Sequence, residues 1–260
     1  MKDILEKPVF VKAELPDPAA APSGVALNCL FHYIQGHRMR LLCIADHVDP
    51  LIYSTGLKER YGKVDLVLSA GDLTLAYYDF IISTLNRPLY FVFGNHHAEE
   101  RRGFGKPRDP FLPNERNVPW ESGAGAVCLE GRVVRVRELT IAGLGGSIWY
   151  NGGENQFTDF TMFVAILRLV PGLLWNRLFH GRFLDVLITH SPPYGINDLP
   201  DPCHTGFKVF LWFMRTFKPR YLVHGHVHLY DRNAAREAQY GSTTVINAYD
   251  HVVIDLESTP

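Results

Sequence analysis

Residues 221–228 read YLVHGHVH, in which a short apolar run is followed at once by three histidines. Apolar runs rich in β-branched and aromatic residues are typical of buried strands. The histidines therefore fall just past the carboxyl end of a predicted strand. In open α/β sheets, functional sites gather outside the carboxyl ends of the strands. The stretch thus predicts an α/β fold with a site at this edge.

Four other apolar runs end in polar residues in the same way. They are followed in turn by Asp46, by Gly71-Asp72, by Gly94-Asn95-His96 and by His190. A single aspartate after a strand is usually a turn residue or a helix N-cap, and a single histidine is usually structural. The joint occurrence of five such tips, in this order, indicates one site assembled from distant positions.

The strand and helix pattern predicts a mixed α/β sheet covered by helices. Strand candidates are residues 41–45, 66–69, 89–93, 133–136, 139–144, 186–189, 221–223 and 243–246. Helical patterns at 49–61, 77–85, 160–179 and 207–217 are long enough to cross between neighbouring strands. The closely spaced strands of 126–144 and the segment after Tyr230 indicate antiparallel additions.

The chain is predicted to form one domain over residues 1–260, with the motifs between 40 and 230. It contains no tandem repeat, and the Pro/Ala-rich piece at 16–22 is too short to separate domains. Residues 101–120 form a polar, Gly/Pro-rich loop by composition.

Composition narrows the class of function. With 26 basic and 27 acidic residues and 47% hydrophobic residues, the chain is globular and carries a net charge of -1. Such a balance supplies no broad field for binding DNA or RNA, so nucleic acid is not an expected partner.

Four separated cysteines form no CxxC pair, which excludes a zinc ribbon and favours a reducing, cytoplasmic location. The first 17 residues lack the apolar run of a secretory signal. The most apolar stretch, residues 161–175, contains Arg168 and Pro171 and is shorter than the roughly 20 residues of a membrane span. No transmembrane segment is expected. We expect a buried or partner-packing helix there, with a membrane-surface patch or a hydrophobic substrate wall as alternatives.

The five blocks resemble those of the calcineurin-like metallophosphoesterase superfamily, which read D-x-H, GD, GNH(D/E), a single His and GHxH. The resemblance covers positions 46 to 228 and implies a four-layer sandwich of two mixed β-sheets flanked by helices. It also implies two divalent metal ions. The first would be held by Asp46, Asp72 and His228, and the second by Asp72, Asn95, His190 and His226.

The implied activity is hydrolysis of a phosphodiester or phosphomonoester by a hydroxide that bridges the two metals. Imidazoles combined with oxygen ligands suit manganese, iron or zinc. The resemblance makes His96 the general acid that protonates the leaving oxygen. The expected partner is a small-molecule or other phosphoester substrate.

Two positions depart from the family pattern. Val48 stands where a second histidine of the first block is expected, and it cannot bind metal. The first site is then weak and completed by water, completed by His47 or Asp49 if the chain leaves strand geometry after Asp46, or empty. His97 stands where an acid is usual, which predicts slower or differently pH-dependent chemistry.

Other features leave alternatives open. His204, in a loop at 197–205 over the site, contacts substrate or simply begins the following helix. His224, closer to its strand than the other two histidines, is expected to support the ligands rather than bind metal. A nuclease and a non-catalytic scaffold, as in the phosphoesterase-like retromer subunit, are the alternative functions.

Overall fold

The computed structural model describes residues 38–96, 125–231 and 234–257. These residues belong to one compact unit, Arg38–Ser258. The predicted features at residues 16–22, at His97 and at residues 101–120 lie outside the described residues.

The first sheet has the strand order β13-β1-β2-β3-β4. β1 (Arg38–Ala45), β2 (Leu66–Ser69), β3 (Leu89–Phe91) and β4 (Ala126–Cys128) run parallel. β13 (Asp250–Glu257) pairs antiparallel with β1 along its whole length, so that Ala45 lies opposite Asp250. The carboxyl ends of β1, β2 and β3 therefore meet at one edge.

The second sheet has the order β11-β12-β10-β9-β6-β5. Its central strands β6 (Leu139–Leu144), β9 (Val186–Thr189), β10 (Tyr221–His224) and β12 (Thr243–Asn247) are parallel. β5 (Val133–Val136) and β11 (Glu237–Tyr240) are antiparallel to their neighbours at the two edges. A two-stranded piece, β7 (Ser147–Ile148) and β8 (Gln156–Phe157), follows β6.

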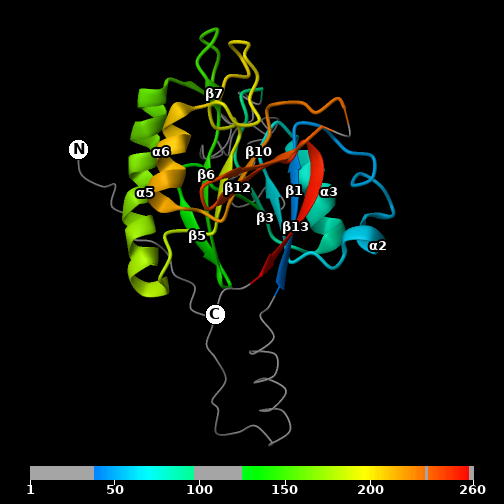
Figure 1. Ribbon diagram of the computed structural model, residues 1–260. Helices are drawn as coiled ribbons and strands as arrows, with labels where there is room; N and C mark the ends of the chain where they lie inside the picture. Colours follow the sequence, from blue (N-terminus) through cyan, green and yellow to red (C-terminus); the bar gives the residue numbers. More distant parts are fainter. Residues whose placement is uncertain (1–37, 97–124, 232–233, 258–260) are drawn as a thin grey trace, which may run out of the picture. The chain divides into compact units, whose positions relative to one another are not determined.

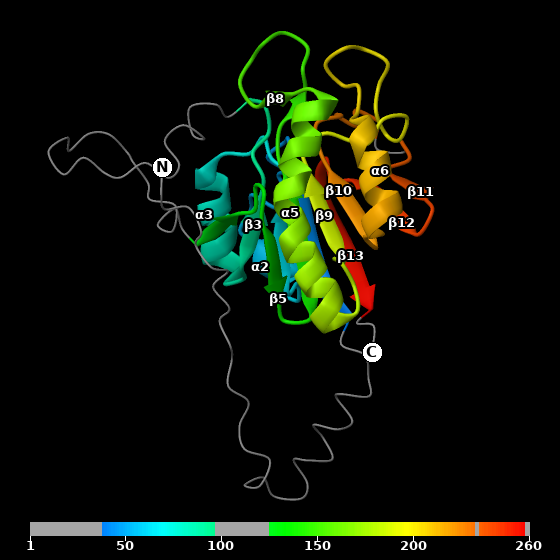
Figure 2. The ribbon, with the colours of Figure 1, turned by 90° about the vertical axis from the view of Figure 1, so that its left-hand side faces the viewer.

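Alternation of side chains along the strands builds the layers. In β1, Leu41 and Cys43 join the core between the two sheets, while Leu42 and Ile44 face the opposite way, toward α2 (Leu57–Tyr61) and α3 (Leu75–Leu85). On the outer side of the second sheet lie α5 (Asp159–His180) and α6 (Lys208–Phe217), side by side in Figures 1 and 2. The predicted four-layer α/β sandwich with two mixed sheets is confirmed.

Local signals set the helix ends. The hydroxyl of Thr158 accepts from the backbone N–H of Thr161, and Thr161 bonds back to the N–H of Thr158, which completes a capping box at the start of α5. Gly181 ends the same helix with φ of 75°, a conformation that glycine adopts at no steric cost.

The predicted helix at 49–61 is wrong over most of its length. Only Leu57–Tyr61 is α-helical. The Asp49 carboxylate accepts from the backbone N–H of Leu51 at 2.7 Å, and the Ser54 hydroxyl donates to the Leu51 carbonyl at 3.0 Å. Such local side-chain bonds favour turns over helix in this segment.

α5 is buried on one side only, so one face packs in the core as expected, and the partner-packing, membrane-surface and substrate-wall alternatives concern its other face. Met162, Ile166, Leu169 and Leu173 pack on the second sheet, while side chains on the opposite face are exposed. Its length and its mean hydropathy of 1.4 would fit a membrane span, but core helices also fit those criteria.

Candidate metal centre

Three of the predicted ligands occupy left-handed backbone positions directly after strands. Asp46, Asp72 and His226 have φ of 63°, 55° and 67°. Asp and His enter this region more readily than bulkier residues, and such strain gathers at functional sites. The turn after β1 lets both Asp46 carboxylate oxygens accept from the His226 backbone N–H at 2.9 Å. Asp46 thereby ties the ends of β1 and β10, which belong to different sheets.

Two glycines let backbone approach these carboxylates. A Cβ on Gly94 would lie 1.9 Å from Asp72 Oδ1, and one on Gly225 would lie 2.5 Å from Asp46 Oδ2. No side chain fits at either position. The glycines of the GNH and GHxH blocks are therefore needed for close approach.

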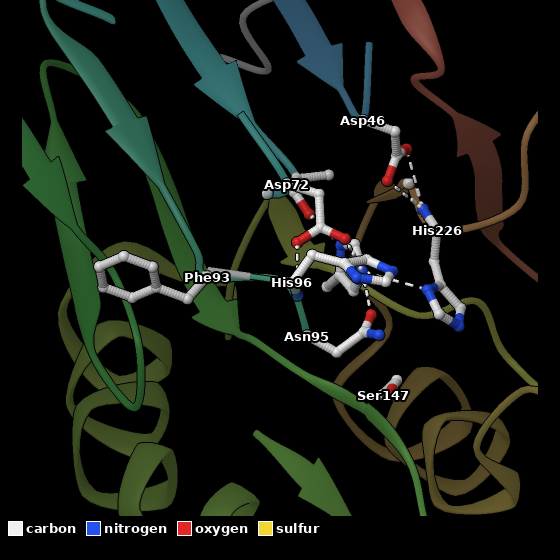
Figure 3. A network of polar contacts seen from close by, with 12 residues as sticks. Asp46, Asp72, Phe93, Asn95, His96, Ser147 and His226 are labelled. Atoms are coloured by element: carbon white, nitrogen blue, oxygen red, sulfur yellow. Dashed lines mark hydrogen bonds and ion pairs between the residues drawn. The ribbon is translucent and has the colours of Figure 1, made fainter. Parts of the chain in front are cut away.

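Four acceptor groups converge in what we call the inner cluster, formed by Asp72, Asn95, His190 and His226 (Figure 3). His190 Nε2 lies 3.0 Å from Asn95 Oδ1, 3.3 Å from Asp72 Oδ2 and 3.1 Å from His226 Nδ1. The other ring nitrogens face backbone carbonyls: His190 Nδ1 donates to Ala70 at 2.8 Å, and His226 Nε2 donates to Cys203 at 2.6 Å.

These carbonyls fix where each neutral imidazole carries its proton. His190 and His226 then turn unprotonated nitrogens toward each other, beside an amide oxygen and a carboxylate. Four acceptors with no donor between them require a proton or a cation. The mixed nitrogen and oxygen set suits a divalent transition metal, so the residues fit the implied ion.

Electrostatics point the same way. Burial alone would lower the pKa of His190, but the charge and hydrogen bond of Asp72 override it and raise the pKa to about 9. Burial lowers the pKa of His226 to about 3. At neutral pH a metal-free cluster thus holds a proton on His190 Nε2, at the place where a cation would bind.

Asp46 extends this charge pattern. Burial raises the pKa of its carboxyl to about 7; His190 opposes this shift and Asp72 adds to it. Ligand atoms of Asp46, Asp72 and His190 all lie within 4.8 Å of one another. Two buried carboxylates this close are stabilised by a shared cation.

The first metal group is less complete. His228 is exposed, its ring lies 4.9 Å from that of Tyr249, and its Nδ1 is 3.3 Å from the Tyr230 hydroxyl. Partial burial is the main cause of the lowered pKa of His228, the charge of His204 adds to it, and the charge of Asp72 opposes it. Val48 is 37% exposed. His228 therefore lies beside the inner cluster rather than in it.

His47 and Asp49 are engaged elsewhere. The chain does leave strand geometry at Asp46, but His47 Nδ1 lies 2.7 Å from Asp250 Oδ1. Asp49 is buried and also accepts from His251 Nδ1 at 2.5 Å. Neither side chain is directed at the first metal group by these contacts.

His96 lies at the exposed rim of the cluster. Its backbone N–H donates to Asp72 Oδ1 at 3.1 Å, and the turn before it is held by Asn155, whose Nδ2 donates to the carbonyls of Phe93 and Gly94 at 3.2 and 2.7 Å. Asn95 Nδ2 donates to the Tyr150 hydroxyl at 3.2 Å. Sequence reasoning missed Asn155 and Tyr150, because no motif or periodicity marks them.

The loop over the site brings His204 against the cluster. Its ring lies 5.2 Å from that of His226, and its Nδ1 is 2.9 Å from Asp201 Oδ1. His204 precedes α6 by several residues and does not cap it, since Phe207 is the N-cap. His224 is buried, donates to the Gly225 carbonyl at 2.9 Å, and has its pKa lowered to about 4 by burial.

Comparison with known proteins gives one matching family and several solved structures that align with the chain. The sequence matches the family model described as calcineurin-like phosphoesterase over residues 39–230. No curated protein matches the chain. One solved structure aligns with a TM-score of 0.59 at 16% identity, covering 84% of this chain and 95% of that chain.

Two further structures align with the chain. The protein TT1561 of Thermus thermophilus gives a TM-score of 0.55 at 16% identity, covering 82% of this chain and 90% of that chain. A single mutant of Vps29 from Entamoeba histolytica gives 0.38 at 12% identity, over 85% and 87%, which is too low to carry an argument. TT1561 shares the fold.

Proposed function

The chain belongs to the calcineurin-like phosphoesterase family, and from this premise we propose that it is a metal-dependent hydrolase of a phosphate ester. The observation that carries the proposal is the inner cluster, where two imidazoles, an amide oxygen and a carboxylate converge on one point. A scaffold would gain nothing from this convergence, because gathering buried polar and ionisable groups at one point costs desolvation free energy.

We assign the second metal, manganese, iron or zinc, to Asp72, Asn95, His190 and His226, and the first to Asp46, Asp72 and His228. When bound, such a pair activates water and neutralises phosphate oxygens. Ala70 and Cys203 would orient the imidazoles through their carbonyls. Asp72 would bridge the two groups and also fix the His96 backbone.

His96 is the proposed general acid. Its exposed side chain stands at the rim, where a leaving oxygen departs toward solvent, and the Asp72 bond to its backbone sets its position. His204, against the ring of His226, is the proposed substrate contact.

The remaining assignments are coarser. We propose that the chain forms a single domain and acts in the cytoplasm on a small phosphoester. We do not expect nucleic acid to be its substrate. Among the described residues Cys43 and Cys203 are free thiols, which agrees with a reducing compartment. The balanced charge argues against a nucleic-acid substrate.

Hydrolysis of nitrophenyl phosphate and of bis(nitrophenyl) phosphate in the presence of manganese tests the function. We expect turnover of at least one class, abolished by chelator and by Asn95→Ala. A matched control is Gln239→Ala, which removes an exposed amide on the edge strand β11, away from the inner cluster. Absence of turnover on both esters in a metal-loaded protein would favour a metal-binding scaffold, the alternative that Val48 supports.

The two metal groups should fill unequally. The inner cluster offers four converging ligands, whereas the first group has Val48 in place of a histidine and an exposed His228. Manganese titration followed by calorimetry should show a tight and a weak site. Val48→His should tighten the weak site, and His226→Ala should remove the tight one. Equal affinities in the unchanged protein would show that His47 or Asp49 moves to complete the first group.

Metal uptake should release protons. At pH 7 and without metal, His190 of the inner cluster holds a proton, with its pKa of about 9, and Asp46 of the first metal group holds part of one, with its pKa of about 7. Both groups bind metal only when deprotonated, so apparent affinity should rise with pH and level off above about 9.

Calorimetry in two buffers of different ionisation heat measures this release. At pH 7 we expect the first equivalent of metal that binds to release about one to 1.5 protons. In Asp46→Asn the release should fall toward one proton. A heat of binding that is the same in both buffers would show that no proton occupies the cluster.

A further inference from the structure

The outer face of α5 carries a continuous line of exposed apolar side chains. Phe160 and Leu178, near its two ends, are 73% and 76% exposed. We call this set the α5 stripe: Phe160, Val164, Leu167, Pro171, Leu174, Trp175, Leu178 and Phe179. At 1.5 Å per residue the helix is about 33 Å long. Scattered exposed apolar residues are ordinary, but a contiguous patch marks a binding surface.

Helical geometry confines most of the stripe to one face. At about 100° per residue, Phe160 to Leu178 of the stripe fall within a sector about 100° wide, with Phe179 at its margin. Met162, Ile166, Leu169 and Leu173 fall on the opposite side and are buried against the second sheet. The stripe is therefore a second apolar face, separate from the one that folds the protein.

The charge around the stripe has one sign. Arg168 lies on one side of the sector and Arg177 on the other. The exposed charged residues of α5 and α6, with the C-cap of α6, are all basic: Arg168, Arg177, Lys208, Arg215 and Lys218. Asp159, the one acid in the two helices, accepts from the Val209 N–H at 3.0 Å. This contrasts with a chain whose net charge is only -1.

We propose that the α5 stripe docks on the surface of a bilayer that contains anionic phospholipids, with the helix lying in the plane of the interface. Apolar and aromatic side chains flanked by arginine are the pattern of interfacial helices. Trp175, whose ring lies 4.2 Å from that of Phe179, suits the headgroup level. Arg168 and Arg177 would meet anionic headgroups, which adds attraction at each cation.

The basic residues beside the α5 stripe favour an anionic bilayer surface over other binding partners. A second copy of the chain, docked symmetrically through the same face, would bring arginines against arginines. Spanning the bilayer would require the buried face of α5 to leave the second sheet. The surface of an anionic bilayer buries the apolar stripe and attracts the basic residues beside it. It does so without repulsion between arginines and without moving α5 away from the second sheet.

Flotation with lipid vesicles tests the proposal on the full chain. Protein should float with vesicles of phosphatidylcholine and phosphatidylserine, and much less with phosphatidylcholine alone. The double variant Leu174→Glu with Leu178→Glu should lower the partition coefficient roughly tenfold or more. Arg168→Gln and Arg177→Gln should each lower it about fivefold on anionic vesicles and little on neutral ones.

The matched control is Val253→Glu, an exposed apolar residue on β13 in the other sheet, which should leave binding unchanged. Thermal melting checks that each variant is folded, and hydrolysis of a soluble ester should be the same in all. The proposal is overturned if the unchanged protein ignores anionic vesicles, or if the α5 variants bind as well as the control. Light scattering that shows a dimer lost in Leu174→Glu with Leu178→Glu, without vesicle binding, would assign the stripe to self-association instead.

Discussion

His96→Ala is expected to lower turnover of an alkyl phosphate ester by about 10²–10⁴-fold while leaving the metal content unchanged. His96 is held beside the inner cluster by its backbone bond to Asp72 at 3.1 Å, and no contact places its ring among the acceptors. Its loss should therefore remove proton donation and spare metal binding. Steady-state kinetics with elemental analysis of the same samples measures both effects.

The leaving group provides the internal control for His96. Nitrophenolate is a weak base and departs almost without a proton, so the loss on a nitrophenyl ester should be much smaller. Gln239→Ala on the edge strand β11 again serves as the reference variant. An equal loss on both leaving groups, or a loss of metal, would assign His96 to phosphate binding or to the architecture of the site.

Gly94→Ala should be as damaging as removal of a ligand. Its Cβ would lie 1.9 Å from Asp72 Oδ1 and 2.7 Å from His190 Cε1, so the Asp72 carboxylate or the turn itself must move. Misplacement of a reacting group by about 1 Å can cost about 10²-fold in rate, and here a ligand moves as well. We expect at least that loss in turnover together with weaker manganese binding.

Gly153→Ala is the matched glycine variant for this experiment. Its Cβ would meet only the ends of the Gln156 and Asn151 side chains, which can move aside. It should keep turnover and metal affinity. Near-normal activity in Gly94→Ala would mean that Asp72 does not need its observed position, and the bridging role assigned to it would fall.

Much of the fold was predictable because strands that are buried on both faces are apolar at nearly every position. Strands such as Val186–Thr189 are continuous apolar runs, and parallel strands bring their carboxyl ends to one edge whatever their separation along the chain. That is why Asp72, Asn95 and His190 could be grouped from the order of the residues alone. The prediction of a helix at 49–61 was wrong because the Asp49 carboxylate accepts from the backbone N–H of Leu51 and stabilises a turn. The spacing of apolar residues gives no sign of this bond.

Other parts of the site depend on backbone angles and loop packing. The direction of His47 follows from φ of 63° at Asp46 and from Asp250, which is distant in sequence. Asn155 reaches the turn before His96 from a separate loop. The exposure of the α5 stripe depends on what covers the helix, and an apolar helix has the same sequence whether its outer face is covered or open.

Elemental analysis tests the central claim, that the inner cluster holds a metal for hydrolysis. Protein purified with manganese, iron and zinc available should carry roughly one or more transition-metal ions per chain, and His190→Ala prepared in parallel should carry far less. His180→Ala, which changes an exposed histidine at the end of α5 outside the cluster, should keep its metal. If the unchanged protein carries none of the three metals, or if His190→Ala retains them in full, the account is contradicted.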